Sequence, residues 1–275
     1  MSAKLYIVAT PIGNLGDISG RAIEILKQVD LIAAEDTRHS KTLLERCAIK
    51  SKVCAYHEHN EAQLTLQLIE KLIEGLSIAL ISDAGTPLIN DPGYKLVAAA
   101  HDNGLQVVPI PGPSAIITAL SASGLPTNKF IFEGYLPAKT EARKKCLQEL
   151  QTESRTLIFY EAPHRILELI QDMQEIFGSE RRVTIARELT KQFEQIVRDT
   201  LTVINSKLES EEIKIKGEFV VIVEGTHASP ISDIETLRIN RILSEKLSPK
   251  EAAGLTAKIT GKKKNEVYKL TLDSE

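Results

Sequence analysis

Short hydrophobic runs alternate along this chain with segments in which apolar residues recur every three or four positions. The runs have the length of buried strands, and the periodic segments have the spacing of amphipathic helices. The expected strands are residues 4–10, 31–34, 77–82, 105–110, 130–136, 156–161, 182–187, 193–198 and 218–224. This alternation is typical of an α/β fold with a largely parallel sheet. Residues 193–198 follow the preceding strand closely enough for an antiparallel pair, so the second half is expected to hold a mixed sheet.

The expected helices carry signals at their ends. Asp17 or Ser19 is expected to cap the first helix, because short polar side chains accept hydrogen bonds from free N–H groups there. Asn60, with Gln63 three residues later, resembles a capping box, and Pro113 suits the first turn of a helix that ends at residue 123. These boundaries place loops rich in glycine and proline directly after strands.

The periodicity and the composition both break at residues 225–230. We therefore expect an N-terminal α/β domain over residues 1–124 and a second α/β domain over residues 125–226. A small basic helical extension over residues 230–275 would follow, with helices at 234–247 and 249–259. No apolar run approaches the roughly 20 residues of a membrane helix, and the first residues lack the pattern of a signal peptide. We expect a cytoplasmic protein without a membrane partner.

The net charge of the 275-residue chain is −3, which does not by itself favour nucleic-acid binding. Positive charge is concentrated in two places instead. The first contains Lys139, Arg143, Lys144 and Lys145, with Glu141 as its acid. The second spans residues 238–269, where nine lysines and arginines stand against three acids. A nucleic-acid partner would be contacted there.

Three of the glycine- and proline-rich loops, residues 10–17, 82–93 and 111–115, follow strands, where α/β proteins bind ligands. The sequence has neither a GxxxxGK[ST] motif nor a GxGxxG after the first strand, so a phosphate cradle is not supported. His57 and His59 could chelate, but no third ligand is evident, and no metal is expected. The pocket suits a nucleoside held by backbone groups and one acid, Asp83.

Five ordered segments then resemble the landmarks of a known family. They are TPIGNLGD at 10–17, AEDTRHS at 34–40, SDAGTPLINDPG at 82–93, PGPSA at 111–115 and FYEAPHR at 159–165. The chain resembles the tetrapyrrole-methylase-like superfamily of S-adenosylmethionine-dependent methyltransferases over residues 4 to about 225. Within it, the chain is most similar to the bacterial 16S rRNA (cytidine-2′-O)-methyltransferases.

The resemblance implies two α/β domains of the tetrapyrrole methylase type with the S-adenosyl-L-methionine cleft between them, a small helical C-terminal extension, and a homodimer. The donor-binding residues that it implies are Ile12, Gly13, Asp83, Gly85, Thr86, Ser114, Ala115, Tyr160, Arg187 and Gly217. The expected RNA-binding residues are Lys139, Arg143, Lys144, Lys145, Arg165, Lys262, Lys263 and Lys264. The expected partner is 16S rRNA, either free or in the small ribosomal subunit, methylated on a cytidine of the decoding region.

The implied chemistry is attack of a ribose oxygen on the donor methyl, so alignment contributes most and a general base adds to it. Candidates for the base are Glu35, Asp36, Asp83 and Glu161. Glu35 and Asp36, beside Arg38, are expected to pair with it and stay ionised. These three residues are assigned to placing the target ribose, with a structural ion pair as the alternative.

Other functions remain open at this point. A corrin or porphyrin C-methyltransferase shares the family, but the basic tail and the segments at 34–40 and 159–165 favour RNA. A non-catalytic RNA-binding assembly factor with a vestigial pocket is opposed by the intact glycine loops. A helix-turn-helix regulator of DNA would leave the first 225 residues unexplained, so DNA is not expected as a partner.

Overall fold

The computed structural model describes residues 3–226 and 233–272. The chain divides into two compact units, one of Met1–Gln151 with Arg155–Glu224 and one of Thr152–Ser154 with Gly225–Glu275. Part of the expected break at 225–230 and the start of the expected extension lie outside the described residues. Within the described ranges, no helix is long and apolar enough to cross a membrane.

The first sheet of the larger unit is parallel throughout, in the order β3-β2-β4-β1-β5. Its strands are β1 (Lys4–Val8), β2 (Leu31–Ala34), β3 (Lys52–Ala55), β4 (Ile78–Ile81) and β5 (Gln106–Ile110). The central strand β4 is buried along its length, as its apolar run predicts. The edge strand β3 was not expected, because half of its residues are exposed and it lacks an apolar run.

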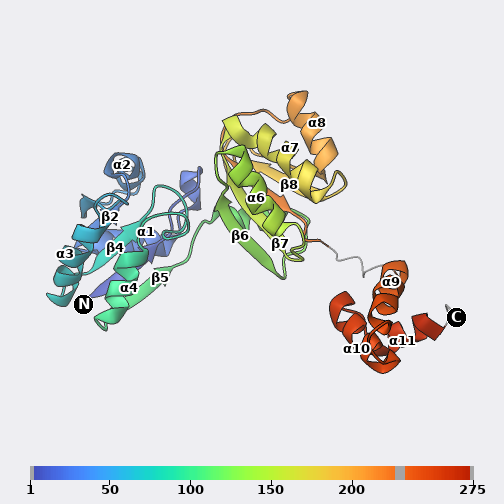
Figure 1. Ribbon diagram of the computed structural model, residues 1–275. Coiled ribbons are helices and arrows are strands. Elements are labelled where there is room, and N and C mark those ends of the chain that lie inside the picture. The colour runs from blue at the N-terminus through green and yellow to red at the C-terminus, as the bar shows by residue number, and fades with distance from the viewer. Residues whose placement is uncertain (1–2, 227–232, 273–275) are drawn as a thin grey trace. The chain divides into compact units, whose positions relative to one another are not determined.

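Helices cover both faces of this sheet (Figure 1). They are α1 (Gly20–Gln28), α2 (Thr37–Arg46), α3 (Glu61–Ile73) and α4 (Tyr94–Asp102), with a short 3-10 turn at Leu15–Asp17. Side chains of α1 and α2 pack on one face with Val8 and Ile32, and side chains of α3 and α4 pack on the other with Leu5 and Ile78. The alternation along each strand separates these two cores.

The second sheet of the same unit is mixed, which confirms the expectation for the second half. Its order is β6-β7-β10-β8-β9; β6 and β7 are parallel and the other pairs antiparallel. The strands are β6 (Phe130–Tyr135), β7 (Thr156–Glu161), β8 (Arg182–Arg187), β9 (Gln195–Thr200) and β10 (Phe219–Val223).

One face of the second sheet is covered by α6 (Thr140–Leu150), α7 (Ile166–Phe177) and α8 (Leu201–Glu209). The other face packs against α5 (Ala115–Ala122), which follows the last strand of the first sheet. In that core Ile116 and Ala119 of α5 lie with Ile158 and Val220 of the second sheet, and Ile12 of the first loop joins them. The two sheets of this unit therefore share a core beside the loops.

One expected cap is confirmed, and two other end signals differ from the expectation. Ser19 caps α1 through the Ala22 N–H, while Asp17 lies in the 3-10 turn. Asn60 precedes α3 but makes no capping box, because its side chain accepts from the His57 N–H and donates to the Ala55 carbonyl. Pro113 lies one residue before Ser114, the N-cap of α5, and so stands outside the helix.

The smaller unit contains α9 (Asp233–Ser244), α10 (Pro249–Thr260) and α11 (Lys264–Leu272). A capping box of Ser248 and Glu251 opens α10, and Gly261 ends it at φ +71°. The sequence predicted the first two helices, but α11 was missed because its start is a run of lysines. Its own small core holds Ala253, Ala257 and Val267. The expected domain limits at 124 and 226 stay a prediction.

Candidate functional site

The three glycine- and proline-rich loops meet beside the carboxyl ends of the parallel strands. Thr10 and Gly85 exchange two backbone hydrogen bonds, of 2.8 and 3.0 Å. The Thr86 hydroxyl donates to the Pro113 carbonyl at 3.0 Å, which ties the second loop to the third. These bonds hold the loops as one wall, so the spacing between its backbone groups is fixed before any ligand binds.

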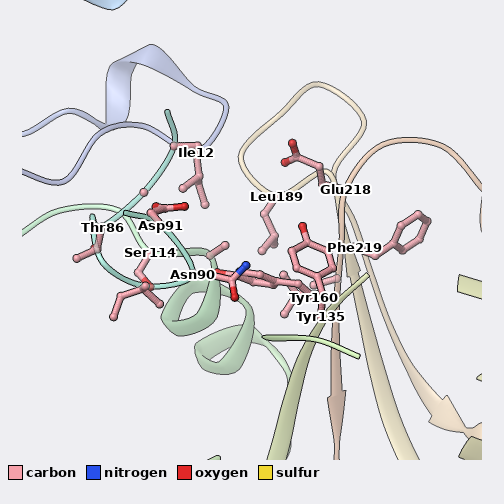
Figure 2. Close-up of a pocket in the computed structure, with 16 residues that line it drawn as sticks. Ile12, Thr86, Asn90, Asp91, Ser114, Tyr135, Tyr160, Leu189, Glu218 and Phe219 are labelled. Atoms are coloured by element: carbon pink, nitrogen blue, oxygen red, sulfur yellow. The ribbon is translucent and has the colours of Figure 1, made fainter. Parts of the chain in front are cut away.

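A first cavity of about 190 Å³ lies between this wall and the second sheet. It is lined by Ile12, Ala84, Gly85, Thr86, Ile89, Asn90, Asp91, Ser114, Ala115, Tyr135, Tyr160, Ala186, Leu189, Glu218, Phe219 and Val220. Figure 2 shows Asp91 and Ile12 on the loop side, with Tyr135, Tyr160 and Glu218 across from them. We call this space the donor cavity.

Aromatic rings form the second-sheet side of the donor cavity. The ring of Tyr160 contacts those of Phe132 and Tyr135, with centroids 4.9 and 5.6 Å apart. Burial raises the pKa of Tyr160 to about 12, so its hydroxyl stays neutral and can donate. On the opposite wall Gly85 has φ +87°, and a Cβ there would lie 3.3 Å from the Cγ2 atom of Ile12. Glycine therefore lets the backbone come close to a ligand.

Half-buried acids surround the end of β4. The Asp83 N–H donates to Glu35 Oε2 at 3.3 Å, and Asp83 Oδ1 accepts from the Asp36 N–H at 3.0 Å. Burial raises the pKa of Glu35. Burial, followed by the charge of Glu35, also raises the pKa of Asp91 to about 6. The hydrogen bonds of Asp83 join the loop at 82–93 to the segment after β2, and Asp91 places a carboxylate in the donor cavity.

Glu35, Asp36 and Arg38, which were expected to form one group, do not all interact with each other in the structure. Asp36 is the N-cap of α2 and pairs with Arg38 at 3.1 Å. Hydrogen bonds from Arg38 lower the pKa of Asp36 to about 2. The expectation that Glu35 shares this pairing is wrong, because its carboxylate points to the Asp83 backbone and burial favours its neutral form. Arg38 instead lines a second cavity.

This second cavity, of about 700 Å³, adjoins the first one. Its lining is Thr10, Pro11, Ile12, Gly13, Leu15, Arg38, His39, Ser40, Thr42, Leu43, Ser82, Asp83, Ala84, Lys191 and Glu218. Ile12, Ala84 and Glu218 line both spaces. A group bound in one cavity would therefore lie next to a group bound in the other.

The structure brings most of the expected donor residues together. Those that line the donor cavity are Ile12, Gly85, Thr86, Ser114, Ala115 and Tyr160, while Gly13 and Asp83 line the second cavity. Arg187 and Gly217 line neither of the two. Arg187 donates to the carbonyls of Lys216 and Phe193, at 2.6 and 3.0 Å, and so braces the chain before β10. Asn90, Asp91 and Tyr135 were not expected, although the first two lie inside the segment at 82–93.

The basic residues of the second sheet are largely used inside the protein. Arg143 is 1% exposed and pairs with Asp172 at 2.6 Å, so the expectation that it contacts RNA is wrong. Lys144 pairs with Glu175 at 2.6 Å. Arg165 lies 3.3 Å from Glu161 and donates to the Leu136 carbonyl. The period of α6 explains the burial, because Arg143 and Leu147 lie one turn apart on its inner face.

The remaining basic positions are mostly exposed. Lys139 and Lys145 stand free of the core on and beside α6, and Lys263 and Lys264 lie at the start of α11. Lys262 differs, since its ammonium pairs with Asp233 and its side chain is largely covered. Among residues 3–226 and 233–272, no group of three or more His, Cys, Asp and Glu residues is arranged to hold a metal ion.

Two family models match the chain. The model described as Tetrapyrrole (Corrin/Porphyrin) Methylases matches residues 4–205, and the RsmI C-terminal HTH domain matches residues 231–275. The chain is 52% identical to ribosomal RNA small subunit methyltransferase I of Vibrio cholerae serotype O1, over 98% of this chain and 94% of the relative. It is 50% identical to the protein of that name from Pseudomonas aeruginosa, over 100% and 99% of the two chains.

Solved structures agree on the fold. Diphthine synthase superposes with a TM-score of 0.61 at 14% identity, over 80% of this chain and 90% of that one. Uroporphyrin-III C-methyl transferase from Thermus thermophilus, complexed with S-adenosyl homocysteine, gives a TM-score of 0.56 at 13% identity, over 80% and 97%. At these identities the likeness concerns the architecture of the two sheets alone.

Proposed function

The chain belongs to the tetrapyrrole methylase family and, within it, to the ribosomal RNA small subunit methyltransferase I group, and from this premise we propose its reaction. It transfers a methyl group from S-adenosyl-L-methionine to the ribose 2′-hydroxyl of the cytidine at position 1402 of 16S rRNA. The observation that supports this most is the pair of adjoining cavities, because a group transfer needs two reactants side by side.

The donor cavity has the features that a sulfonium nucleoside needs. Gly85 keeps one wall open to a flat ligand, and Tyr135 and Tyr160 offer aromatic surface opposite. Ser114 is the N-cap of α5 without a capping bond from its side chain, so its hydroxyl and the first N–H groups of α5 are available to a carboxylate. Asp91 and its neighbouring acids favour a cation.

The protein mainly has to align the reactants and exclude water. When bound, S-adenosyl-L-methionine supplies a methyl group that is already electrophilic. Ile12 and Leu189, which are 8% and 6% exposed, close the donor cavity with apolar surface. Alignment of this kind contributes about 7–11 kcal/mol to lowering a barrier. Asp83, in the wall of the second cavity, joins the loop at 82–93 to the segment after β2 through Glu35 and Asp36.

The structure places the candidates for the general base in different surroundings. Glu161 is buried beside Arg165 and lines neither cavity, and Asp36 is committed to the cap of α2. Arg38, in the second cavity, is suited to placing the RNA, and Glu35 and Asp36 then order the wall behind it. A phosphate contact by Arg38 would fix the position of the target ribose without reading sequence.

The smaller unit supplies a second contact to RNA. Lys263 and Lys264 at the start of α11 are exposed, and Lys264 lines a groove together with Lys250 and Lys258 of α10. Such a basic surface neutralises phosphates and makes binding depend on salt. We infer that the chain acts on the small ribosomal subunit in the cytoplasm, as a homodimer with two α/β domains, at 1–124 and 125–226, and an extension at 230–275.

The test is a transfer assay with purified protein, methyl-tritiated S-adenosylmethionine and small ribosomal subunits. Label is expected in 16S rRNA, in dinucleotides that resist alkali because a 2′-O-methyl group blocks cleavage of the next phosphodiester bond. A parallel reaction offers uroporphyrinogen III in place of RNA. Label in the tetrapyrrole would favour a corrin or porphyrin C-methyltransferase. RNA binding without any transfer would favour a non-catalytic assembly factor.

A further inference from the structure

The second cavity contains a buried hydroxyl group with no use inside the protein. Ser40 lies on α2, lines the cavity and is 4% exposed. Its Oγ atom has no hydrogen-bond partner among residues 3–226 and 233–272. Burying an unpaired hydroxyl costs stability, so such a group in a native protein needs an explanation. A ligand that enters the cavity would supply the missing partner.

The junction between the two cavities holds a fixed cation. The Lys191 ammonium donates to Glu188 Oε1 at 2.9 Å and to Glu218 Oε2 at 3.0 Å. Glu218 lines both cavities, and Lys191 lines the second one. The two hydrogen bonds hold the ammonium in the second cavity, beside Glu218, a residue that this cavity shares with the donor cavity.

The turn that places Lys191 beside the second cavity has a strained backbone. Glu188 and Thr190 both have positive φ, of 50° and 65°, which is uncommon for residues other than glycine. The Asn14 N–H donates to the Thr190 hydroxyl at 3.2 Å, so this turn is bound to the first loop. Strain of this kind concentrates at functional sites.

Gly13 supplies independent evidence for the same placement. It has φ +154°, and a Cβ atom there would lie 2.5 Å from Cγ of Lys191. The aliphatic part of the lysine therefore crosses the first loop at a distance that only glycine permits. The loop and the lysine fit each other, although they are far apart in the sequence.

From these observations we propose that the second cavity is the subsite for the target nucleotide of the RNA. The Ser40 hydroxyl hydrogen-bonds the nucleotide inside the cavity, and the Lys191 ammonium donates its third N–H, which neither Glu188 nor Glu218 accepts, to the sugar–phosphate edge. The proposal rests on the proposed function, since the acceptor must reach the donor cavity past Ile12 and Glu218. Arg38, whose side chain is 91% exposed, adds positive charge at the same cavity.

The experiment compares Ser40→Ala and Lys191→Met with two control variants in the full-length protein. Ser210→Ala removes an exposed hydroxyl at the end of α8, and Lys214→Met removes an exposed ammonium that pairs with Glu211. Each variant is measured for S-adenosyl homocysteine affinity by calorimetry, for thermal stability, and for kcat and KM with small ribosomal subunits. RNA affinity without donor is measured by filter binding.

Ser40→Ala is expected to raise KM for the subunit about fivefold, and Lys191→Met about tenfold, while the affinity for S-adenosyl homocysteine is unchanged. Ser40→Ala should be at least as stable as the parent, because no hydrogen bond within the protein is lost. Ser40→Thr keeps the hydroxyl and is expected to restore KM. The two controls should match the parent in every measurement.

Unchanged KM and RNA affinity in both test variants would overturn the subsite. A loss of stability and of donor affinity in Ser40→Ala would also overturn it, because the hydroxyl would then have a structural role. If the parent protein methylates no rRNA, the proposed function fails as well. If the parent methylates rRNA and the variants equal it, only the subsite fails.

Discussion

The two sheets of the larger unit contribute to the site in different ways. The parallel sheet offers backbone, because three short loops at its strand ends are tied together by hydrogen bonds such as those between Thr10 and Gly85. The mixed sheet offers side chains, with Tyr135 and Tyr160 on its strands and Lys191 between β8 and β9 facing the cavities. A motif in the sequence therefore marks the first half of the site well, whereas the second half depends on how the chain packs.

The difference is largest for charged residues of the helices that cover the mixed sheet, and Arg143 of α6 gives the strongest test of the comparison. Arg143→Ala leaves Asp172 buried without its 2.6 Å partner, so the free energy of unfolding should fall by about 3–5 kcal/mol. Lys145→Ala, two residues along the same helix, removes an exposed side chain and should change it by less than about 0.5 kcal/mol. Urea denaturation measures both; equal effects would contradict a buried role for Arg143.

Gly13 lies in a loop of the parallel sheet and packs against Lys191 from the other half of the site. Its substitution should have the next largest effect. In Gly13→Ala the new Cβ would meet Lys191 at 2.5 Å, so the lysine must move from the junction of the cavities. We expect kcat/KM for the small subunit to fall about tenfold, since small displacements in an aligned site are costly. Gly20→Ala is the control, because a Cβ there meets nothing within 4 Å. Equal kinetics in the two variants would show that Lys191 needs no fixed place.

Asp91, on the loop side of the donor cavity, allows a test of the comparison by the pH dependence of stability. Its pKa in the folded protein is raised to about 6 from an ordinary 3.8, so the unfolded chain ionises first as the pH rises. Rising pH therefore costs stability between about pH 4 and pH 6, and the loss is complete above that range. Asp91→Asn should then be more stable than the parent at pH 7–8, with a gain that shrinks toward pH 4.

Thermal melts of the parent and Asp91→Asn across this range measure the gain. The same variant should bind S-adenosylmethionine more weakly at pH 7, because a buried carboxylate attracts the sulfonium cation. Asp102→Asn, at the end of α4, is the control for loss of a carboxylate outside both cavities. A stability difference that does not vary with pH would contradict the raised pKa.

The smallest expected effect lies in the basic tail. Replacing Lys263 or Lys264 by serine should reduce the salt dependence of RNA binding by about one ion each, and weaken binding for all sequences alike. Lys262→Ser should act differently, since this lysine pairs with Asp233 and its loss would lower the stability of the smaller unit. Binding curves at several salt concentrations distinguish the two; an unchanged slope in Lys264→Ser would remove it from the RNA surface.

Much of the fold could be predicted from the sequence because the local pattern of apolar residues determines most helices and strands. The apolar run of β4 and the stripe of α3 with Leu68 and Leu72 needed no tertiary information. The elements α2, β3, α8 and α11 were missed. The strand β3 lies at a sheet edge with half of its residues exposed, and α11 starts in lysines, so neither shows a clear apolar period.

The residues of the candidate site likewise fall into those that local sequence marks and those that only the folded chain reveals. Glycine, proline and small polar residues mark the loops at the strand ends, and the family resemblance pointed to Gly85 and Ser114 within them; both line the donor cavity. Arg187 lines neither cavity, and only the folded chain shows that its guanidinium reaches two backbone carbonyls. Lys191 was missed because its importance depends on Gly13, 178 positions earlier in the sequence.

The donor cavity is tested most directly by calorimetric titration of S-adenosylmethionine into the parent protein and into Ala115→Leu. Ala115 begins α5 and lines the cavity, so a leucine there would occupy the space of the ligand while α5 keeps its apolar face. We predict one binding site per chain in the parent and no measurable heat in the variant, with both proteins equally folded by circular dichroism. Equal binding by the two proteins would contradict a donor site in this cavity.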